Sequence, residues 1–93
     1  MSENKIIITV SGTDKVGIVA KVATILAECS VNIEDIKQTL MQGHFVMFML
    51  CDIEKSNKTF TEFQTLLKDE LRELGMEVWI QRKEIFDCMH SIG

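Results

Sequence analysis

The sequence contains no proline, no low-complexity segment and no internal repeat, so nothing in it marks a linker between domains. Its apolar runs stay well short of the ~20 residues that a membrane-spanning helix needs. The N-terminus also lacks the basic and then apolar pattern of a signal peptide. We therefore expect a single domain over residues 1–93 that resides in the cytoplasm and has no membrane partner.

Basic residues are outnumbered, with 10 Lys and Arg against 14 Asp and Glu and a formal net charge of −4. Binding to a phosphate backbone depends on clustered Lys and Arg, and the sequence has no visible cluster of this kind. The charge balance therefore argues against a nucleic-acid partner.

Cysteines are few, odd in number and without CxxC spacing: they are Cys29, Cys51 and Cys88. This usage is typical of reduced, buried thiols in a cytoplasmic protein. The two histidines, His44 and His90, have no nucleophile or metal-ligand partner at a known spacing, and we expect them at a hairpin end and on the tail surface. The sequence therefore indicates no catalytic residue, no metal and no other cofactor.

The apolar residues, 46% of the chain, recur with strand and helix periods. In chain order they predict a strand at 5–11, a helix after the turn at 12–14, strands at 33–41 and 45–51, a helix from 58 or 59 to 74, and a strand at 76–81. This βαββαβ order predicts an α+β, ferredoxin-like sandwich, in which a four-stranded antiparallel sheet of order 4-1-3-2 carries two helices on one face. The tail, residues 82–93, predicts a short C-terminal tail helix.

Each predicted helix has a start signal and an apolar stripe. Thr13 or Asp14 is expected to cap the first helix, Lys58 or Thr59 opens the second, and Gly75 suits its end. The stripe of the first helix consists of Val16, Val19, Val22, Ala23 and Leu26. The stripe of the second consists of Phe60, Phe63, Leu66, Leu67, Leu71 and Leu74.

The middle strands differ in their patterns. Residues 33–41 alternate as a half-exposed strand does, with a change of phase at residues 34–35 that predicts a bulge. Residues 42–43 suit a tight hairpin turn. The next strand, 45–51, is apolar on both faces, which implies that the second face of the sheet is also covered. A second subunit, the C-terminal tail, or both would provide this cover.

The segment GTDKVGI, residues 12–18, joins the first strand to the first helix, whose first N–H groups point at whatever occupies the turn. It lacks the spacing of a P-loop and of the dinucleotide motif G-x-G-x-x-G. Two interpretations stay open: a plain capped turn, and an anion site for one carboxylate with Lys15 as its cationic side chain. We place Gly17 in the first helical turn, where glycine suggests that a neighbouring strand or a ligand approaches the backbone closely.

The stretch GTDKVGIVAKVATILAECSVNIEDI, residues 12–36, resembles the signature of ACT domains, with a polar turn, D-K/R-x-G-I/V/L, an apolar helix and then V-N-I. The ending IQRKEIFDCMHSIG resembles small stand-alone ACT proteins of unassigned function, which in turn are similar to the ACT domains of glycine cleavage system transcriptional repressors. The likeness covers nearly the whole chain. Val16 stands where many relatives have proline.

The resemblance implies a non-enzymatic regulatory module that binds a small ligand, typically an amino acid, at the interface of a homodimer. It implies a site with two walls, in which helix N–H groups take the α-carboxylate while Asp14 and the Asn32 carbonyl receive the ammonium. The residues so implicated are Gly12, Thr13, Asp14, Lys15, Val16, Gly17 and Ile18 from the turn, and Asn32 and Ile33 from the second strand.

An alternative function is a protein-interaction module whose apolar sheet face and tail bind a partner enzyme or regulator. It predicts an exposed apolar patch around Met47, Met49, Trp79 and Phe86. Two further functions of the same fold are disfavoured. An acylphosphatase needs an arginine in the first turn, and an RNA-binding sheet needs paired aromatics within a basic surface.

Overall fold

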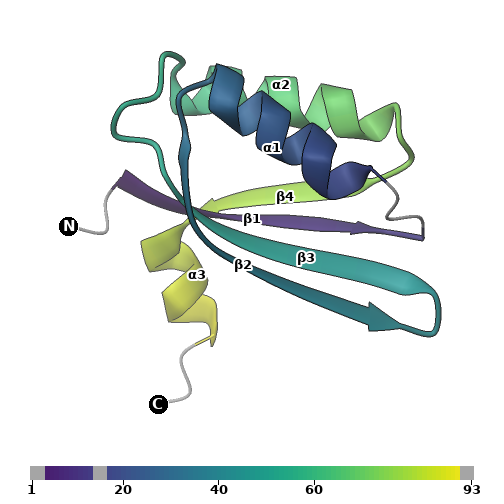
Figure 1. Ribbon diagram of the computed structural model, residues 1–93. Coiled ribbons are helices and arrows are strands. Elements are labelled where there is room, and N and C mark those ends of the chain that lie inside the picture. The colour runs from purple at the N-terminus through teal and green to yellow at the C-terminus, as the bar shows by residue number, and fades with distance from the viewer. Residues whose placement is uncertain (1–3, 14–16, 91–93) are drawn as a thin grey trace.

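The computed structural model describes residues 4–13 and 17–90. Their elements are, in chain order, β1 (Lys5–Gly12), α1 (Ile18–Glu28), β2 (Asn32–Met41), β3 (His44–Asp52), α2 (Phe60–Arg72), β4 (Glu77–Arg82) and α3 (Lys83–His90). The strands form one antiparallel sheet in the order β2-β3-β1-β4, which confirms the predicted ferredoxin-like order. Figure 1 shows α1 and α2 on one face of this sheet and α3 on the other side.

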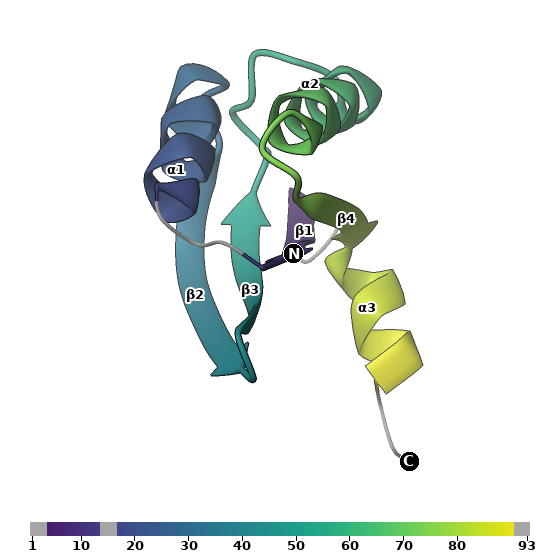
Figure 2. The ribbon, with the colours of Figure 1, turned by 90° about the vertical axis from the view of Figure 1, so that its right-hand side faces the viewer.

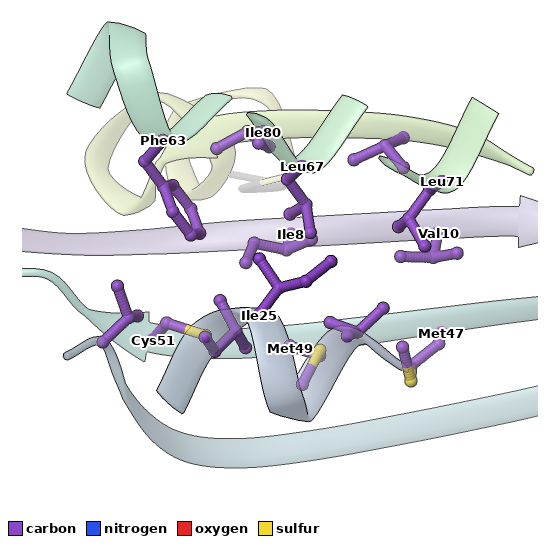
Figure 3. Packing of buried hydrophobic residues seen from close by; sticks show 14 of the residues in the cluster. Ile8, Val10, Ile25, Met47, Met49, Cys51, Phe63, Leu67, Leu71 and Ile80 are labelled. Atoms are coloured by element: carbon purple, nitrogen blue, oxygen red, sulfur yellow. The ribbon is translucent and has the colours of Figure 1, made fainter. Parts of the chain in front are cut away.

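The core lies between the sheet and the pair α1 and α2. Alternate residues of β1 and β3 point toward these helices because successive side chains of a strand face opposite ways. The buried cluster consists chiefly of Ile6, Ile8, Val10, Met47, Met49 and Cys51 from the strands and Val22, Ile25, Leu26, Phe63, Leu67 and Leu71 from the helices. Figure 3 shows the α2 side chains directed at β1. The main core is therefore a single layer under two helices.

The apolar stripe of α1 differs from the predicted one. Its buried residues are Ile18, Val22, Ile25 and Leu26. Val19 and Ala23 are only half-buried, and Val16 lies outside the described residues. The period of the stripe was predicted correctly, but its phase was partly wrong. Both phases contain Val22 and Leu26, and packing on the sheet selects the one that buries the two isoleucines.

The start of α2 confirms the predicted signal. Thr59 is the N-cap, and its Oγ1 accepts a hydrogen bond from the Glu62 N–H at 3.1 Å. In return, Glu62 Oε1 accepts from the Thr59 N–H at 3.0 Å, which completes a capping box. This backbone hydrogen bond lowers the pKa of Glu62. The box fixes where α2 begins.

We expect Thr59→Ala to lower the free energy of unfolding by about 1 kcal/mol, because it removes the oxygen that accepts from the first turn. Thr61→Ala is the matched control, since Thr61 is an exposed residue inside the same helix. It should leave stability within about 0.5 kcal/mol of the native value. Urea denaturation followed by circular dichroism measures both. Equal losses in the two variants would contradict the capping role.

The end of α2 is also as predicted at Gly75, which has a φ of 76°. The Met76 N–H donates to the Leu71 carbonyl and the Gly75 N–H to the Arg72 carbonyl, both at 3.0 Å, in the pattern of a Schellman motif. Leu74, however, is 48% exposed, so its assignment to the apolar stripe was wrong.

Strand β2 is more exposed than predicted. The bulge is confirmed, since the pairing with β3 shifts between Ile33 and Asp35. The hairpin at Gln42 and Gly43 is confirmed too, with positive φ at both residues. Every residue from 34 to 40 is nevertheless exposed, so the prediction of a half-exposed strand, with one face buried, was wrong. β2 lies at the edge of the sheet, and among the described strands only β3 is its neighbour.

The open face is the surface of the sheet turned away from α1 and α2, formed by Ile7, Thr9, Val46, Phe48, Leu50 and Trp79. The predicted tail helix is present as α3, which lies on this side and packs against β1 and β4 (Figure 2). Ile7 is only 8% exposed, but Trp79 and Ile85 of α3 are 48% and 52% exposed. The tail helix therefore covers only part of the open face.

The exposed patch predicted for a protein-interaction module was partly wrong. Met47 and Met49 are 0% exposed and lie beneath the helices, on the opposite face from Trp79. The side chain of Phe86 lies outside the part of the chain that the structure describes.

Candidate functional site

The first wall of the candidate site is the β1–α1 corner, which the structure describes at Gly12, Thr13, Gly17 and Ile18. Asp14, Lys15 and Val16 lie outside the described residues. Helix α1 begins at Ile18, with Gly17 as its N-cap, and no side chain of the described residues caps it by a hydrogen bond. The predicted N-cap at Thr13 or Asp14 is therefore wrong, since Gly17 is the N-cap residue.

The N-terminus of α1 presents hydrogen-bond donors. The Gly17 carbonyl accepts from the Lys21 N–H at 2.9 Å, the first bond of the helix, and the N–H groups before it have no partner inside the helix. Among the described residues, the first turn of α1 contains no acidic side chain that would neutralise the positive end of the helix dipole. Such a terminus suits an anionic group of a ligand.

Two positions of the corner contain glycine, and their surroundings differ. Gly17 has a φ of 79°, which favours glycine, and a Cβ there would meet no atom of the described residues within 4 Å. Its predicted place inside the first helical turn was wrong. At Gly12, a Cβ would lie 1.9 Å from the Met76 Sδ. That glycine accommodates the segment between α2 and β4.

The second wall begins at Asn32, which is exposed, and Ile33, which is half-buried. A hollow of about 360 Å³ is lined by Ser30, Asn32, Asp52, Glu54 and Lys55. Asp52 accepts from the Glu54 N–H at 2.8 Å and pairs with Lys5 at 3.2 Å, and these contacts, the first above all, lower the pKa of its carboxyl. An ionised carboxylate beside amide and hydroxyl oxygens suits an ammonium group.

The two walls lie at opposite ends of the molecule. Gly12 pairs with Phe45, which pairs with Leu40, whereas Asn32 pairs with Asp52 at the other end of the sheet. Helix α1, 11 residues long, separates them by about 16 Å. Figure 1 shows the start of α1 and the start of β2 at the two ends of the sandwich. One chain does not bring Gly17 and Asn32 together.

One polar pair near the corner escaped the sequence analysis. Ser11 Oγ lies 2.7 Å from His44 Nε2 on the exposed end of β1 and β3. His44 is at the hairpin end, as predicted. The contact between Ser11 and His44 depends on the register of β1 against β3, in which Ser11 pairs with Val46. No local pattern in the sequence predicts this register. The pair adds hydrogen-bonding capacity next to Gly12.

The cysteines offer little reactivity in the core. Cys29 and Cys51 are buried, as predicted, and burial raises the pKa of Cys51 to about 12 and that of Cys29 in the same direction. Both thiols are protonated at neutral pH and are poor nucleophiles. Cys88 is exposed on α3, so the prediction of burial was wrong there.

No described helix has the length and apolar character needed to cross a membrane.

Comparisons with known proteins agree with one another. The sequence model of the ACT domain family matches residues 4–81. The chain is 48% identical over 86 residues to a UPF0237 protein of Listeria innocua, covering 92% of this chain and 97% of that protein. An ACT domain protein from Streptococcus pneumoniae has a TM-score of 0.78 and 36% identity, over 89% of this chain and 93% of that chain. A structure described as a glycine cleavage system transcriptional repressor has a TM-score of 0.73 and 26% identity, over 84% of this chain and 44% of that chain.

Proposed function

Because the chain belongs to the ACT domain family, we propose that it is a non-enzymatic regulatory module of the cytoplasm that binds an amino acid between two copies of itself. The observation that supports this most is the placement of the two candidate walls. Each has the chemistry for one end of an amino acid, and they stand at opposite ends of the chain's own sheet.

The exposed edge of β2 offers a way to join the walls. Its outer backbone groups lack a neighbouring strand, and Ile36 and Leu40 on its helix side are 38% and 56% exposed. A two-fold axis beside β2 sets two β2 strands antiparallel and extends the sheet across both copies. This operation exchanges the ends of the sandwich. It therefore brings Asn32 of one copy toward the β1–α1 corner of the other.

The ligand's orientation follows from the charges of the two walls. Its α-carboxylate meets the N–H groups at the start of α1, with Lys15 as the neighbouring cation. Its ammonium meets the Asn32 carbonyl and Asp14, beside the hollow that contains the ionised Asp52. Thr13, Val16, Ile18 and Ile33 complete the site as lining.

We expect at least one of the twenty amino acids to raise the melting temperature of the full chain. Gly17→Asp should remove this shift, because a carboxylate at the helix N-terminus occupies and repels the place of the ligand's carboxylate. Gly17→Asn is the matched control, since it has the same size, no charge, and a side chain that also tolerates positive φ. Gly17 is exposed, and a Cβ there would meet none of the described atoms within 4 Å, so both variants should fold.

Three outcomes would count against this function or part of it. A folded protein whose melting temperature responds to none of the twenty amino acids argues against amino-acid binding. If Gly17→Asp and Gly17→Asn lose the ligand-induced rise in melting temperature equally, the result argues against an anion site at the corner. Small-angle scattering is expected to give the mass of two copies, and a monomer with a Gly17-dependent shift would leave binding intact but overturn the shared site.

A further inference from the structure

The open face contains a groove beside the edge strand. Its volume is about 320 Å³, and it is lined by Ile7, Phe48 and Leu50, with Asp35, Ile36, Lys37 and Met49 along the side of β2 and β3. Phe48 and Leu50 are half-buried and Ile7 is nearly buried. A hollow of this size with an apolar floor is in the range that small ligands occupy.

Opposite charges stand at one side of this apolar floor. Asp35 pairs with Leu50 and Lys37 pairs with Phe48 across the β2–β3 ladder, so both charged residues share the open face with the floor residues. The bulge before Asp35 sets this phase. The two residues are neighbours on one face of the strand, with Cα atoms about 6.6 Å apart.

Both charged groups have unused bonding capacity. The Ile36 N–H donates to Asp35 Oδ1 at 2.9 Å, which holds the carboxylate in place. Within residues 4–13 and 17–90, Asp35 Oδ2 and the Lys37 ammonium take part in no ion pair. A fixed anion and a cation beside apolar residues match a molecule that carries both charges at one end and an apolar body at the other.

We propose that the open-face groove binds a small zwitterion with an apolar body, an α-amino acid of about the size of leucine. The ammonium of this ligand pairs with Asp35 and its carboxylate pairs with Lys37. The side chain packs on Ile7, Phe48 and Leu50.

This site is separate from the one at the dimer interface. None of its lining residues belongs to the β1–α1 corner or to the start of β2 at Asn32 and Ile33. Asp35 and Lys37 point to the open face, so pairing of β2 with a second copy leaves the groove accessible. The inference therefore does not depend on the proposed function.

The test is a titration of the full chain with L-leucine, followed by backbone amide shifts in NMR and by the emission of the single tryptophan. Trp79 pairs with Thr9, which pairs with Phe48, so it lies in the same row of the open face. We expect saturable shifts at Ile7, Phe48 and Leu50. Isoamylamine, without the carboxylate, and 4-methylpentanoic acid, without the ammonium, should each bind about tenfold more weakly or worse.

Variants separate the two charges from the apolar floor. Asp35→Asn keeps an oxygen for the Ile36 N–H and Lys37→Gln keeps part of the apolar stem, and each should weaken leucine binding about tenfold. Lys68→Gln, an exposed lysine of α2, is the matched control and should change nothing. Gly17→Asp should leave the open-face shifts intact even if it removes an effect at the corner.

Four results would overturn the proposal. These are shifts confined to α1 and lost in Gly17→Asp, equal binding of leucine and its two singly charged analogues, and no saturation at millimolar leucine. The fourth is open-face shifts that follow protein concentration without ligand, which would mean that a second copy occupies the groove.

Discussion

Leu67→Ala is expected to lower the free energy of unfolding by about 2–5 kcal/mol, whereas Leu74→Ala should change it by less than about 0.5 kcal/mol. Leu67 is 0% exposed and packs between α2 and the sheet, so truncation leaves a cavity in the core (Figure 3). Leu74 belongs to the same apolar stripe by its spacing, but it is 48% exposed beyond the end of α2.

Urea denaturation of both variants at the same protein concentration measures this difference, since assembly makes stability depend on concentration. The pair is matched in chemistry and differs in burial. Similar losses for the two leucines would mean that Leu74 is covered in the folded protein, for example by a second copy. A loss below about 1 kcal/mol for Leu67 would contradict the packing of α2 itself.

The fold could be predicted because its signals agree at several levels. Lys58 or Thr59 gives a helix start before a periodic stripe, Gly75 gives a stop, and residues 42–43 give a hairpin. Each of these is local, and the strand order then follows from right-handed crossovers. No local signal determines which side chains of α1 face the core. Two overlapping stripes were available, and contact with the sheet decided between them.

The exposure of β2 could not be predicted from its alternation. Ile36 and Leu40 have the pattern of a buried face, but β2 ends up at the edge, where the helices of one chain leave them exposed. The alternating pattern of a strand does not predict whether its apolar side is covered by its own chain or by another. The same limit applies to the open face, where apolar residues on β3 indicated a cover but not its identity.

The candidate site, too, could be predicted only in part from the sequence. The residues around Gly17 follow from a strand, a turn and a helix in sequence, and their donor groups follow from the geometry of any helix start. Asn32 was joined to them by family resemblance, and the register places it about one helix length away. The groove with Asp35 and Lys37 was missed because it combines the β2–β3 hairpin with Ile7 of β1, which is distant in sequence.

Gly12→Ala is expected to destabilise the protein by about 1–3 kcal/mol, through overpacking rather than through backbone strain. Gly12 is not among the glycines with positive φ, but a Cβ there would lie 1.9 Å from the Sδ of Met76, a residue that is only 4% exposed. Met76→Ala removes that sulfur and costs about 2–5 kcal/mol by leaving a cavity. Combining the two should cost clearly less than their sum, because the new methyl group enters the space that the sulfur leaves.

The coupling between the two changes is the quantity to measure, by urea denaturation of both single variants and the double variant. Gly43→Ala is the control: Gly43 has a φ of 79° and open space around it, so its cost should be the same with or without Met76→Ala. Additive costs for Gly12 and Met76 would mean that the methionine moves aside without loss. The double variant can also be tested for the rise in melting temperature that an amino acid causes and that Gly17→Asp removes. If the double variant keeps this rise, then Gly12 makes room for Met76 and does not itself bind the ligand's carboxylate.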